Sequence, residues 1–211
     1  MKNARIALLI ASLFLLAACS SEAPKTSSDS KPAETKPAFQ PTYLAGREAL
    51  QKMYISARSW AADAKPYSLQ SIALKEANGQ DGKAGIWSAG FASASRRGMK
   101  VYTWSGVKAE NAPEPGMSNN AEDTYNPSNT STTVFDMAFL RSDSDVAFKA
   151  AEKHGIAPLL KKDQDTKIYY ALNWRPHENK LVWRVLVGDQ NDPKMTLDVD
   201  ASTGTFIKAE K

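Results

Sequence analysis

The side chains best suited to chemistry lie in one short stretch near the C-terminus. Asp198 and Asp200 alternate with apolar residues over positions 195–200, a pattern typical of a β-strand, so both carboxylates project from the same face. Their α-carbons would lie roughly 6.5 to 7 Å apart, a separation that general acid and base catalysis can use. Nothing else in the stretch suggests catalysis. Asp200 is better explained as a turn residue that accepts hydrogen bonds from backbone amides, so we expect a structural role.

The same stretch does not have the spacing of a calcium loop. Asp198, Asp200 and Ser202 supply oxygens at alternate positions, as the start of an EF-hand does. An EF-hand also needs Gly at its sixth position and Glu at its twelfth, where this chain has Thr203 and Ala209. We therefore expect no calcium site here.

The other residue types that could act in catalysis or ligand binding support no enzyme mechanism. The two histidines, His154 and His177, are too few for a zinc site unless carboxylates complete it. No serine lies in a nucleophile-elbow motif, and no Gly-rich loop joins a strand to a helix as phosphate binding requires. We expect a protein that is not an enzyme and that carries no catalytic residue, metal or cofactor.

The N-terminus determines the expected location. Two cations precede an apolar run, residues 6–16, which is shorter than the roughly 20 residues of a spanning helix. This pattern is typical of a signal peptide, here residues 1–18. The run ends in Leu16-Ala17-Ala18-Cys19, which resembles a bacterial lipobox. The resemblance implies cleavage before Cys19 and lipidation of that residue.

A lipidated Cys19 would anchor the chain to a membrane, because several acyl chains together bind a bilayer stably. Cys19 is the only cysteine, so no intrachain disulfide can form and no thiol remains for other chemistry. The next residue is Ser20 and not Asp. By resemblance to Gram-negative lipoproteins, this implies sorting to the outer membrane, with the folded part facing the periplasm.

Charge and composition characterise the chain beyond the anchor. The formal net charge is +4, and removal of a leader containing Lys2 and Arg5 would leave +2. So small a surplus, without a basic cluster in the sequence, argues against a nucleic-acid partner. Residues 19–42 are rich in Ser, Thr, Lys, Glu and Pro and have too few apolar residues to form a core. We expect them to form the lipidated cysteine and a flexible tether.

Hydrophobic periodicity predicts the elements of the folded part. In the first half it indicates a helix over 43–64 and then strands over 67–76, 84–95, 99–105 and 134–140. In the second half it indicates a helix that starts at Ser142 or Ser144, runs through Lys153 and ends at Gly155. Strands over 167–175, 180–188, 195–200 and 205–207 come after a link at 156–165.

One long polar segment, residues 106–132, interrupts the first half. It is rich in Pro and Asn, and a loop of this length in a compact domain tends to be functional or disordered. We favour disorder. If the segment binds a partner, Tyr125 among its asparagines is the candidate contact residue, since tyrosine with small polar neighbours suits adaptable recognition.

The two halves share one order of elements, a helix followed by four strands with a tryptophan in the second strand, Trp87 and Trp183. This predicts an α+β fold of two tandem αββββ units, each a helix packed on an antiparallel sheet. Residues 141–211 resemble a PepSY-type domain, a module of metallopeptidase propeptides and of bacterial envelope proteins. The resemblance is carried by Asp145, Ala147, Ala150-Ala151, Gly155, Leu181-Val182-Trp183-Arg184-Val185 and Leu197-Asp198-Val199-Asp200-Ala201-Ser202-Thr203-Gly204. Residues 43–140 form the diverged copy, because no Asp-Ala-x-Thr-Gly turn follows Trp104.

The resemblance implies a fold and, for some relatives, inhibition or chaperoning of a peptidase. No peptidase domain is present in the chain, so a peptidase partner would act in trans. Trp87 and Trp183 are expected in the core, whereas Trp104 and Trp174 are candidates for exposed interface anchors on an open sheet face.

The function we expect is binding of an envelope protein or peptide. A flat, aromatic-rich exposed sheet would favour that function. The alternative is a small-ligand carrier with a cleft between the two units. A concave apolar pocket above about 300 Å³ would favour the carrier.

Overall fold

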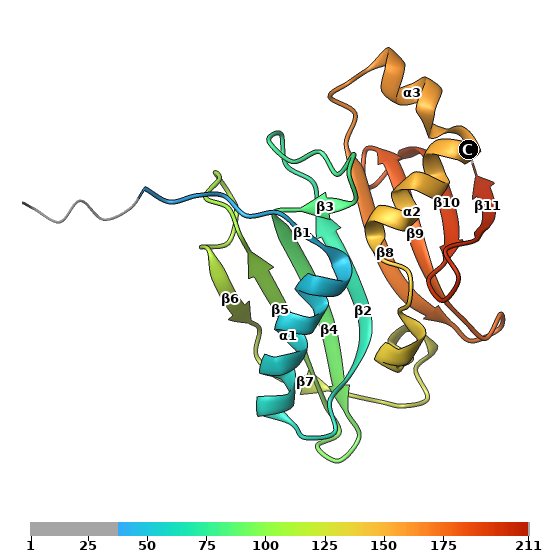
Figure 1. The fold of residues 1–211 in the computed structure, drawn as a ribbon. Helices are drawn as coiled ribbons and strands as arrows, with labels where there is room; N and C mark the ends of the chain where they lie inside the picture. The colour runs from blue at the N-terminus through green and yellow to red at the C-terminus, as the bar shows by residue number, and fades with distance from the viewer. Residues whose placement is uncertain (1–37, 211) are drawn as a thin grey trace, which may run out of the picture. The chain divides into compact units, whose positions relative to one another are not determined.

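A nine-stranded antiparallel sheet organises the part of the chain that the computed structural model describes, residues 38–210 (Figure 1). The sheet order is β11, β10, β9, β8, β2, β4, β5 and β6, and β7 pairs with β5. The strands are β2 (Lys65–Ile72), β4 (Ile86–Ser93), β5 (Gly98–Ser105), β6 (Gly116–Asn119), β7 (Asp123–Thr124), β8 (Ile168–Arg175), β9 (Lys180–Gly188), β10 (Pro193–Asp200) and β11 (Phe206–Glu210). Two short strands, β1 (Leu44–Ala45) and β3 (Lys83–Ala84), form a separate ladder. The fold is therefore mixed α+β, as predicted.

The two halves of the chain meet inside this sheet. Strand β2 pairs with β8 through Ser68 and Asn173, Leu69 and Leu172, and Gln70 and Ala171. The sequence predicts a separate sheet under each helix. Instead β2 and β8 pair with each other, so neither strand is left as a free sheet edge. The described residues from Phe39 onward therefore belong to one compact unit.

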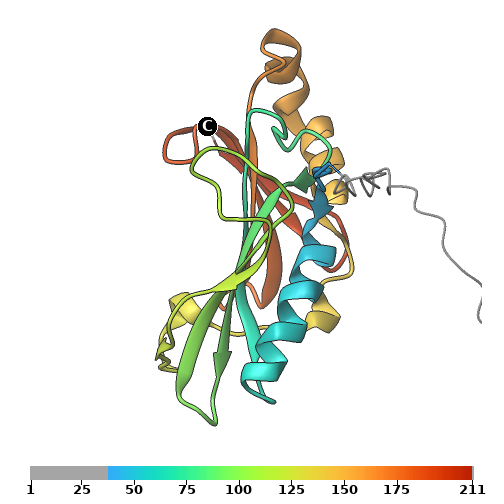
Figure 2. The same cartoon turned by 90° about the vertical axis from the view of Figure 1, so that its left-hand side faces the viewer.

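Helices α1 (Gly46–Trp60) and α2 (Ser144–Ala151) lie on one face of the sheet, and the other face carries no helix (Figure 2). Helix α3 (Ala157–Lys162) lies past the ends of the strands. Helix α1 buries Ala49, Leu50, Met53 and Ala57, the stripe that the spacing of three and four residues predicts. It ends before Lys65-Pro66, as expected where a proline follows.

Two tryptophans form the centre of the core on the helix side. Trp87 and Trp183 are both fully buried, which confirms their predicted role. Their ring centroids lie 6.4 Å apart in an edge-to-face arrangement. Gly46, the first residue of α1, lies directly against these two rings. A β-carbon added at Gly46 would lie only 2.5 Å from the Trp183 ring. The first helix can approach the sheet this closely only with glycine at that position.

Several sequence predictions need correction in the connecting segments. No strand forms over 134–140. Asp136 instead accepts a hydrogen bond from the Ala138 amide and caps a short 3₁₀ turn, Met137–Phe139. The segment 106–132, for which the sequence favours disorder, contains β6, β7 and a 3₁₀ turn, Thr130–Thr132. These strands form because β5 would otherwise end the sheet with an unpaired edge.

The second helix also differs in detail from the prediction. Asp143 caps α2, while the expected caps were Ser142 or Ser144. The backbone then kinks through a π-type turn, Glu152–Ile156, where Gly155 has φ +131°. That positive φ confirms Gly155 as the predicted helix end. Beyond it, the expected link 156–165 contains α3.

Candidate binding surface

The residues predicted to contact a partner are mostly not at the surface. Trp104 is 8% exposed and Tyr125 is 6% exposed, so neither is the exposed anchor that the sequence suggested. Trp104 lies opposite Trp87 in the register of β4 and β5, on the face that the helices cover. Tyr125 is held by its amide, which donates to the Arg97 carbonyl at 2.9 Å. Both aromatic rings serve packing. The predicted signal peptide, Cys19 and the tether up to residue 37 lie outside the described residues.

Trp174 is the predicted contact residue that stays partly accessible. It is half-buried, and its ring packs at 5.1 Å on Phe139, which is 45% exposed. The pair forms a small aromatic corner below the start of α2. Two rings make a narrow anchor, so the corner is at most the edge of a larger contact.

The paired aspartates have structural roles. Asp200 accepts hydrogen bonds from the amides of Ser202 at 2.8 Å and Thr203 at 3.3 Å, which confirms the predicted turn. Asp198 is buried, and one of its carboxylate oxygens forms ion pairs with Arg175 at 2.7 Å and with Arg184 at 3.2 Å. The two guanidinium groups compensate the charge of this buried carboxylate.

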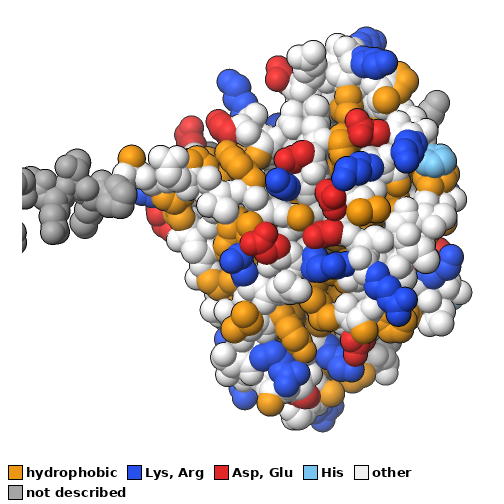
Figure 3. All heavy atoms as spheres, viewed as in Figure 1, with side chains coloured by type: hydrophobic (Ala, Val, Ile, Leu, Met, Phe, Trp, Pro, Cys, Tyr) orange, Lys and Arg blue, Asp and Glu red, His pale blue; other side chains and the backbone are white. Residues whose placement is uncertain are grey.

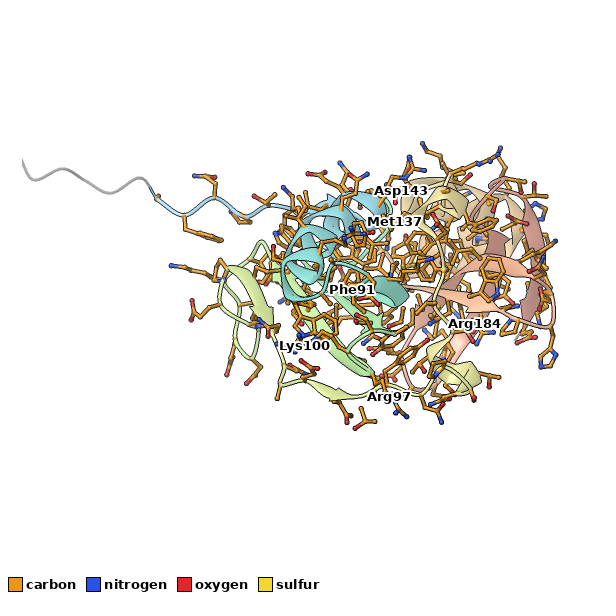
Figure 4. All side chains as sticks on the ribbon, turned by 90° about the horizontal axis from the view of Figure 1, so that it is seen from below. Phe91, Arg97, Lys100, Met137, Asp143 and Arg184 are labelled. Carbon is orange, nitrogen blue, oxygen red and sulfur yellow. The ribbon has the colours of Figure 1, made fainter. Side chains whose placement is uncertain are left out.

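The ion pairs of Asp198 link neighbouring strands on the face of the sheet away from the helices. Lys208 on β11 lies 3.9 Å from Asp198, so the cluster joins β8, β9, β10 and β11. Figure 4 shows Arg184 on that face and Asp143 on the helix side. Burial alone would lower the pKa of Arg175, but the hydrogen bond and charge of Asp198 outweigh it and raise that pKa. The cluster is a cross-strand contact that fixes the sheet.

Basic side chains lie beside hydrophobic ones at the lower end of α1 (Figure 3), and several of the hydrophobic residues there are aromatic. Arg58 lies over the Tyr54 ring at 5.7 Å. Arg96 and Lys100 lie over the Trp60 ring at 5.6 and 5.9 Å. These distances are in the range of cation–π attraction. We call these five residues the basic tip.

Glu122, from the segment between β6 and β7, lies inside the basic tip. Its carboxylate accepts the Trp60 indole N–H at 2.8 Å and two donors of Arg96 at 3.1 and 3.4 Å. The indole hydrogen bond and then the Arg96 hydrogen bond lower the pKa of Glu122, so the carboxylate is ionised. The segment 106–132 therefore contributes Glu122 to the surface, and not Tyr125.

A second carboxylate fixes the hairpin that carries Arg96. Asp63, just after α1, accepts hydrogen bonds from the Ser93 hydroxyl at 2.6 Å and from the amide and hydroxyl of Ser95, each at 2.9 Å. These contacts, Ser93 first, lower the pKa of Asp63 to about 2. They tie the β4–β5 hairpin, which carries Arg96, to the end of α1.

Two of the concave surfaces lie beside the loop 75–83, and polar side chains line much of both. A depression of about 370 Å³ lies between Tyr43 and the loop 75–83. A groove of about 500 Å³ lies between that loop and helices α2 and α3, with Gln80, Glu152, Lys161 and Gln164 beside Phe148, Ala157 and Leu160 in its lining. The volume of the groove lies above the limit of about 300 Å³ that a carrier site would need, but charged and amide side chains line much of it.

Sequence reasoning missed the basic tip because its members are far apart in the chain. Trp60 and Glu122 are separated by 62 positions, and Arg58 is far in sequence from Arg96 and Lys100. The dipeptide Arg96-Arg97 in a predicted turn was the one local signal.

Comparison with protein-family models, with curated proteins and with solved structures gives no match. Within residues 38–210, no three His, Cys, Asp or Glu side chains are grouped so that they could hold a metal ion. None of the helices described is long and apolar enough to cross a membrane.

Proposed function

We propose that this chain is a lipid-anchored protein of the bacterial envelope that binds a protein or peptide partner through its basic tip and carries out no catalysis. The observation that carries the proposal is the composition of the tip. Tyrosine, tryptophan and arginine are the residues that dominate binding hot spots. Here they lie at the surface near the end of α1, and Asp63 ties the hairpin that carries Arg96 to that helix. The partner could be a peptidase acting in trans or an envelope assembly.

The anchor part of the proposal rests on the N-terminal sequence. The lipobox-like Leu16-Ala17-Ala18-Cys19 supports lipidation at Cys19, and Ser20 supports the outer membrane as the destination. Cys19→Ser should abolish labelling by radioactive palmitate and release the protein from isolated membranes. Labelling that persists in this variant would refute the anchor.

The finer fold proposal, two tandem PepSY-like units over 43–140 and 141–211, is supported by an equivalence between the two tryptophans. The Trp87 indole donates to the Leu44 carbonyl, two residues before α1 begins. The Trp183 indole donates to the Ser142 carbonyl, two residues before α2 begins. Both hydrogen bonds measure 2.9 Å. The same contact at the same offset in each half is what a duplicated unit would retain.

Site-specific photo-crosslinking tests the binding surface. A photoreactive amino acid at Ser59, exposed beside the basic tip, should give a discrete adduct in intact cells. The same residue at Gln51, exposed on α1 two turns earlier, is the matched control and should not. The Ser59 adduct should disappear when Trp60→Ala and Arg96→Ala are combined. Equal adducts from both positions, or an adduct that survives the double substitution, would refute the basic tip as the binding surface.

A small-ligand carrier remains the second candidate because the groove between the loop 75–83 and helices α2 and α3 reaches about 500 Å³. Its lining makes it the weaker choice, because pockets for apolar ligands are predominantly apolar. Saturable binding of an apolar fluorophore that Leu160→Arg abolishes would favour the carrier over the protein binder.

A further inference from the structure

The basic tip already holds a ligand group supplied by the chain itself. The Glu122 carboxylate accepts the Trp60 N–H and pairs with the guanidinium of Arg96, and the Lys100 ammonium lies over the Trp60 ring. Two nitrogens of Arg96, Nε and Nη2, face the two oxygens of Glu122, the paired geometry in which arginine best recognises a carboxylate. The site is therefore built for a planar anion of this kind.

We infer that the basic tip recognises a carboxylate of an acidic segment in the partner, and that Glu122 occupies the position of this carboxylate until the partner displaces it. The inference rests on the proposed function, because it names the chemistry of the partner that the tip would bind.

The charge balance of the tip favours an acidic partner. The tip carries three cations, Arg58, Arg96 and Lys100, of which Arg96 pairs with Glu122. The nearby Asp63 carboxylate is held by Ser93 and Ser95. Arg97 is exposed in the same hairpin as Arg96. A partner with two or more carboxylates would neutralise cations that Glu122 leaves uncompensated, and opposite charge also speeds the encounter.

Glu122 is placed so that it can be exchanged. Its side chain is 33% exposed and that of Arg96 is 48% exposed, so their ion pair competes with water and contributes little to stability. The residue lies between two short strands, β6 and β7, whose pairing with β5 does not use its side chain. The carboxylate can therefore leave without disturbing the sheet.

An anionic membrane surface fits the tip less well than an acidic peptide does. Tryptophans at membrane interfaces place their apolar ring against lipid. The Trp60 ring lies beneath Arg96 and Lys100, and its N–H is directed at a carboxylate. Covered in this way, the ring is a poor membrane anchor.

Binding of a short acidic peptide tests the inference directly. The full chain with Cys19→Ser is titrated into fluorescein-labelled hexaglutamate, with hexaglutamine as the uncharged probe, and fluorescence anisotropy is recorded. Glu122→Gln keeps the shape and the acceptor for Trp60 but removes the competing charge, so hexaglutamate should bind about two- to fivefold more tightly. Arg96→Gln should weaken binding about tenfold because the paired donors are lost. Hexaglutamine should not bind.

A second carboxylate of the same segment gives the matched control. Glu114→Gln makes the same change in net charge at an exposed position outside the tip and should leave the affinity unchanged. Equal tightening by Glu114→Gln and Glu122→Gln would mean that only net charge matters. Weaker binding by Glu122→Gln would mean that Glu122 positions Trp60 and Arg96 instead of occupying the site. Either result overturns the inference.

The remaining outcomes separate this inference from the proposed function. Binding to phosphatidylglycerol vesicles without binding to hexaglutamate would identify a lipid surface and overturn the inference. A Ser59 crosslink in cells without hexaglutamate binding would leave the proposed function in place and overturn only the acidic partner. Hexaglutamate binding with the expected ranking of variants, but without a Ser59 crosslink, would support the carboxylate site and refute the proposed function.

Discussion

Single buried side chains determine how the core holds together, and Trp183 is the clearest case. It is fully buried, packs edge-to-face on Trp87 and has its only donor satisfied by the Ser142 carbonyl. Alternation of apolar residues along β9 predicted its burial, because every second side chain of a strand faces the core. The indole hydrogen bond depends on where α2 starts, and strand periodicity alone does not specify that.

Trp183→Ala should lower the free energy of unfolding by about 3 to 5 kcal/mol, because it leaves a cavity and an unpaired carbonyl. Urea denaturation followed by circular dichroism measures the change. Ile55→Ala is the control, since Ile55 is 71% exposed on the outer side of α1 and should change stability by no more than about 0.5 kcal/mol. An unchanged midpoint for Trp183→Ala would place that side chain outside the core.

The Asp63 carboxylate should make stability depend on pH in the acid range. Its hydrogen bonds with Ser93 and Ser95 hold its pKa at about 2 in the folded chain, below the ordinary value of 3.8. A depressed pKa means that the stabilisation is present above about pH 4 and is lost as the pH falls toward 2.

Asp63→Asn should therefore flatten the decrease of unfolding free energy between about pH 4 and pH 2, measured by urea denaturation at successive pH values. Glu114→Gln, which removes an exposed carboxylate elsewhere, should keep the wild-type profile. A profile for Asp63→Asn as steep as that of the wild type would show that other carboxylates cause the acid sensitivity.

At the scale of elements, one polar junction joins the starts of α1 and α2. The same oxygen of Asp143 accepts the Ser144 amide at 2.7 Å and the Arg47 amide at 2.8 Å. The Ser144 hydroxyl accepts the Gly46 amide at 2.8 Å and donates to the Gly82 carbonyl at 2.6 Å. Two residues of the second half therefore satisfy amides that begin the helix of the first half.

Asp143→Ala should destabilise the chain by about 1 to 3 kcal/mol, because it removes acceptors from two helix starts at once. Asp143→Asn keeps one carbonyl oxygen and should cost clearly less. Thermal unfolding by circular dichroism compares the two variants. An equal loss for Asn and Ala would mean that the negative charge near the helix dipoles matters more than the hydrogen bonds.

The sequence predicts elements better than it predicts their neighbours. The helix α1 and the strands β4, β5, β8, β9 and β10 were all predicted from the local spacing of apolar residues. Strand β6 in the polar segment was not predicted, because all four of its residues are exposed and no apolar residues alternate with polar ones along it. The pairing of β2 with β8 escaped as well, because it joins residues about a hundred positions apart and depends on which edges remain free.

The same distinction applies to the binding surface. The burial of Trp104 and Tyr125 could not be predicted from their residue types, because aromatic residues are common both in cores and at interfaces. The basic tip depends on tertiary contacts such as that of Trp60 with Glu122.

At the scale of the whole molecule, the two halves share one sheet and one core. Leu69 and Leu172 lie opposite each other at the β2–β8 junction, and both are fully buried. Outside the sheet, the Gln80 side chain donates to the carbonyls of Gln164 and Thr166, at 2.8 and 3.0 Å. Separation of the halves would expose the junction and break these contacts. The folded part should therefore unfold as one cooperative unit even though its elements repeat.

Leu172→Ala tests this cooperativity across the junction. The cavity in the second half should cost about 2 to 5 kcal/mol, and amide hydrogen exchange should show the slowest amides of α1, in the first half, losing protection by the same free energy. Tryptophan fluorescence and circular dichroism should report a single coincident transition. Ile55→Ala, the exposed control, should leave the slowest exchange of both halves unchanged. Protection that falls only in β8, β9 and β10 would show that the second half unfolds independently and that the shared sheet does not couple the two.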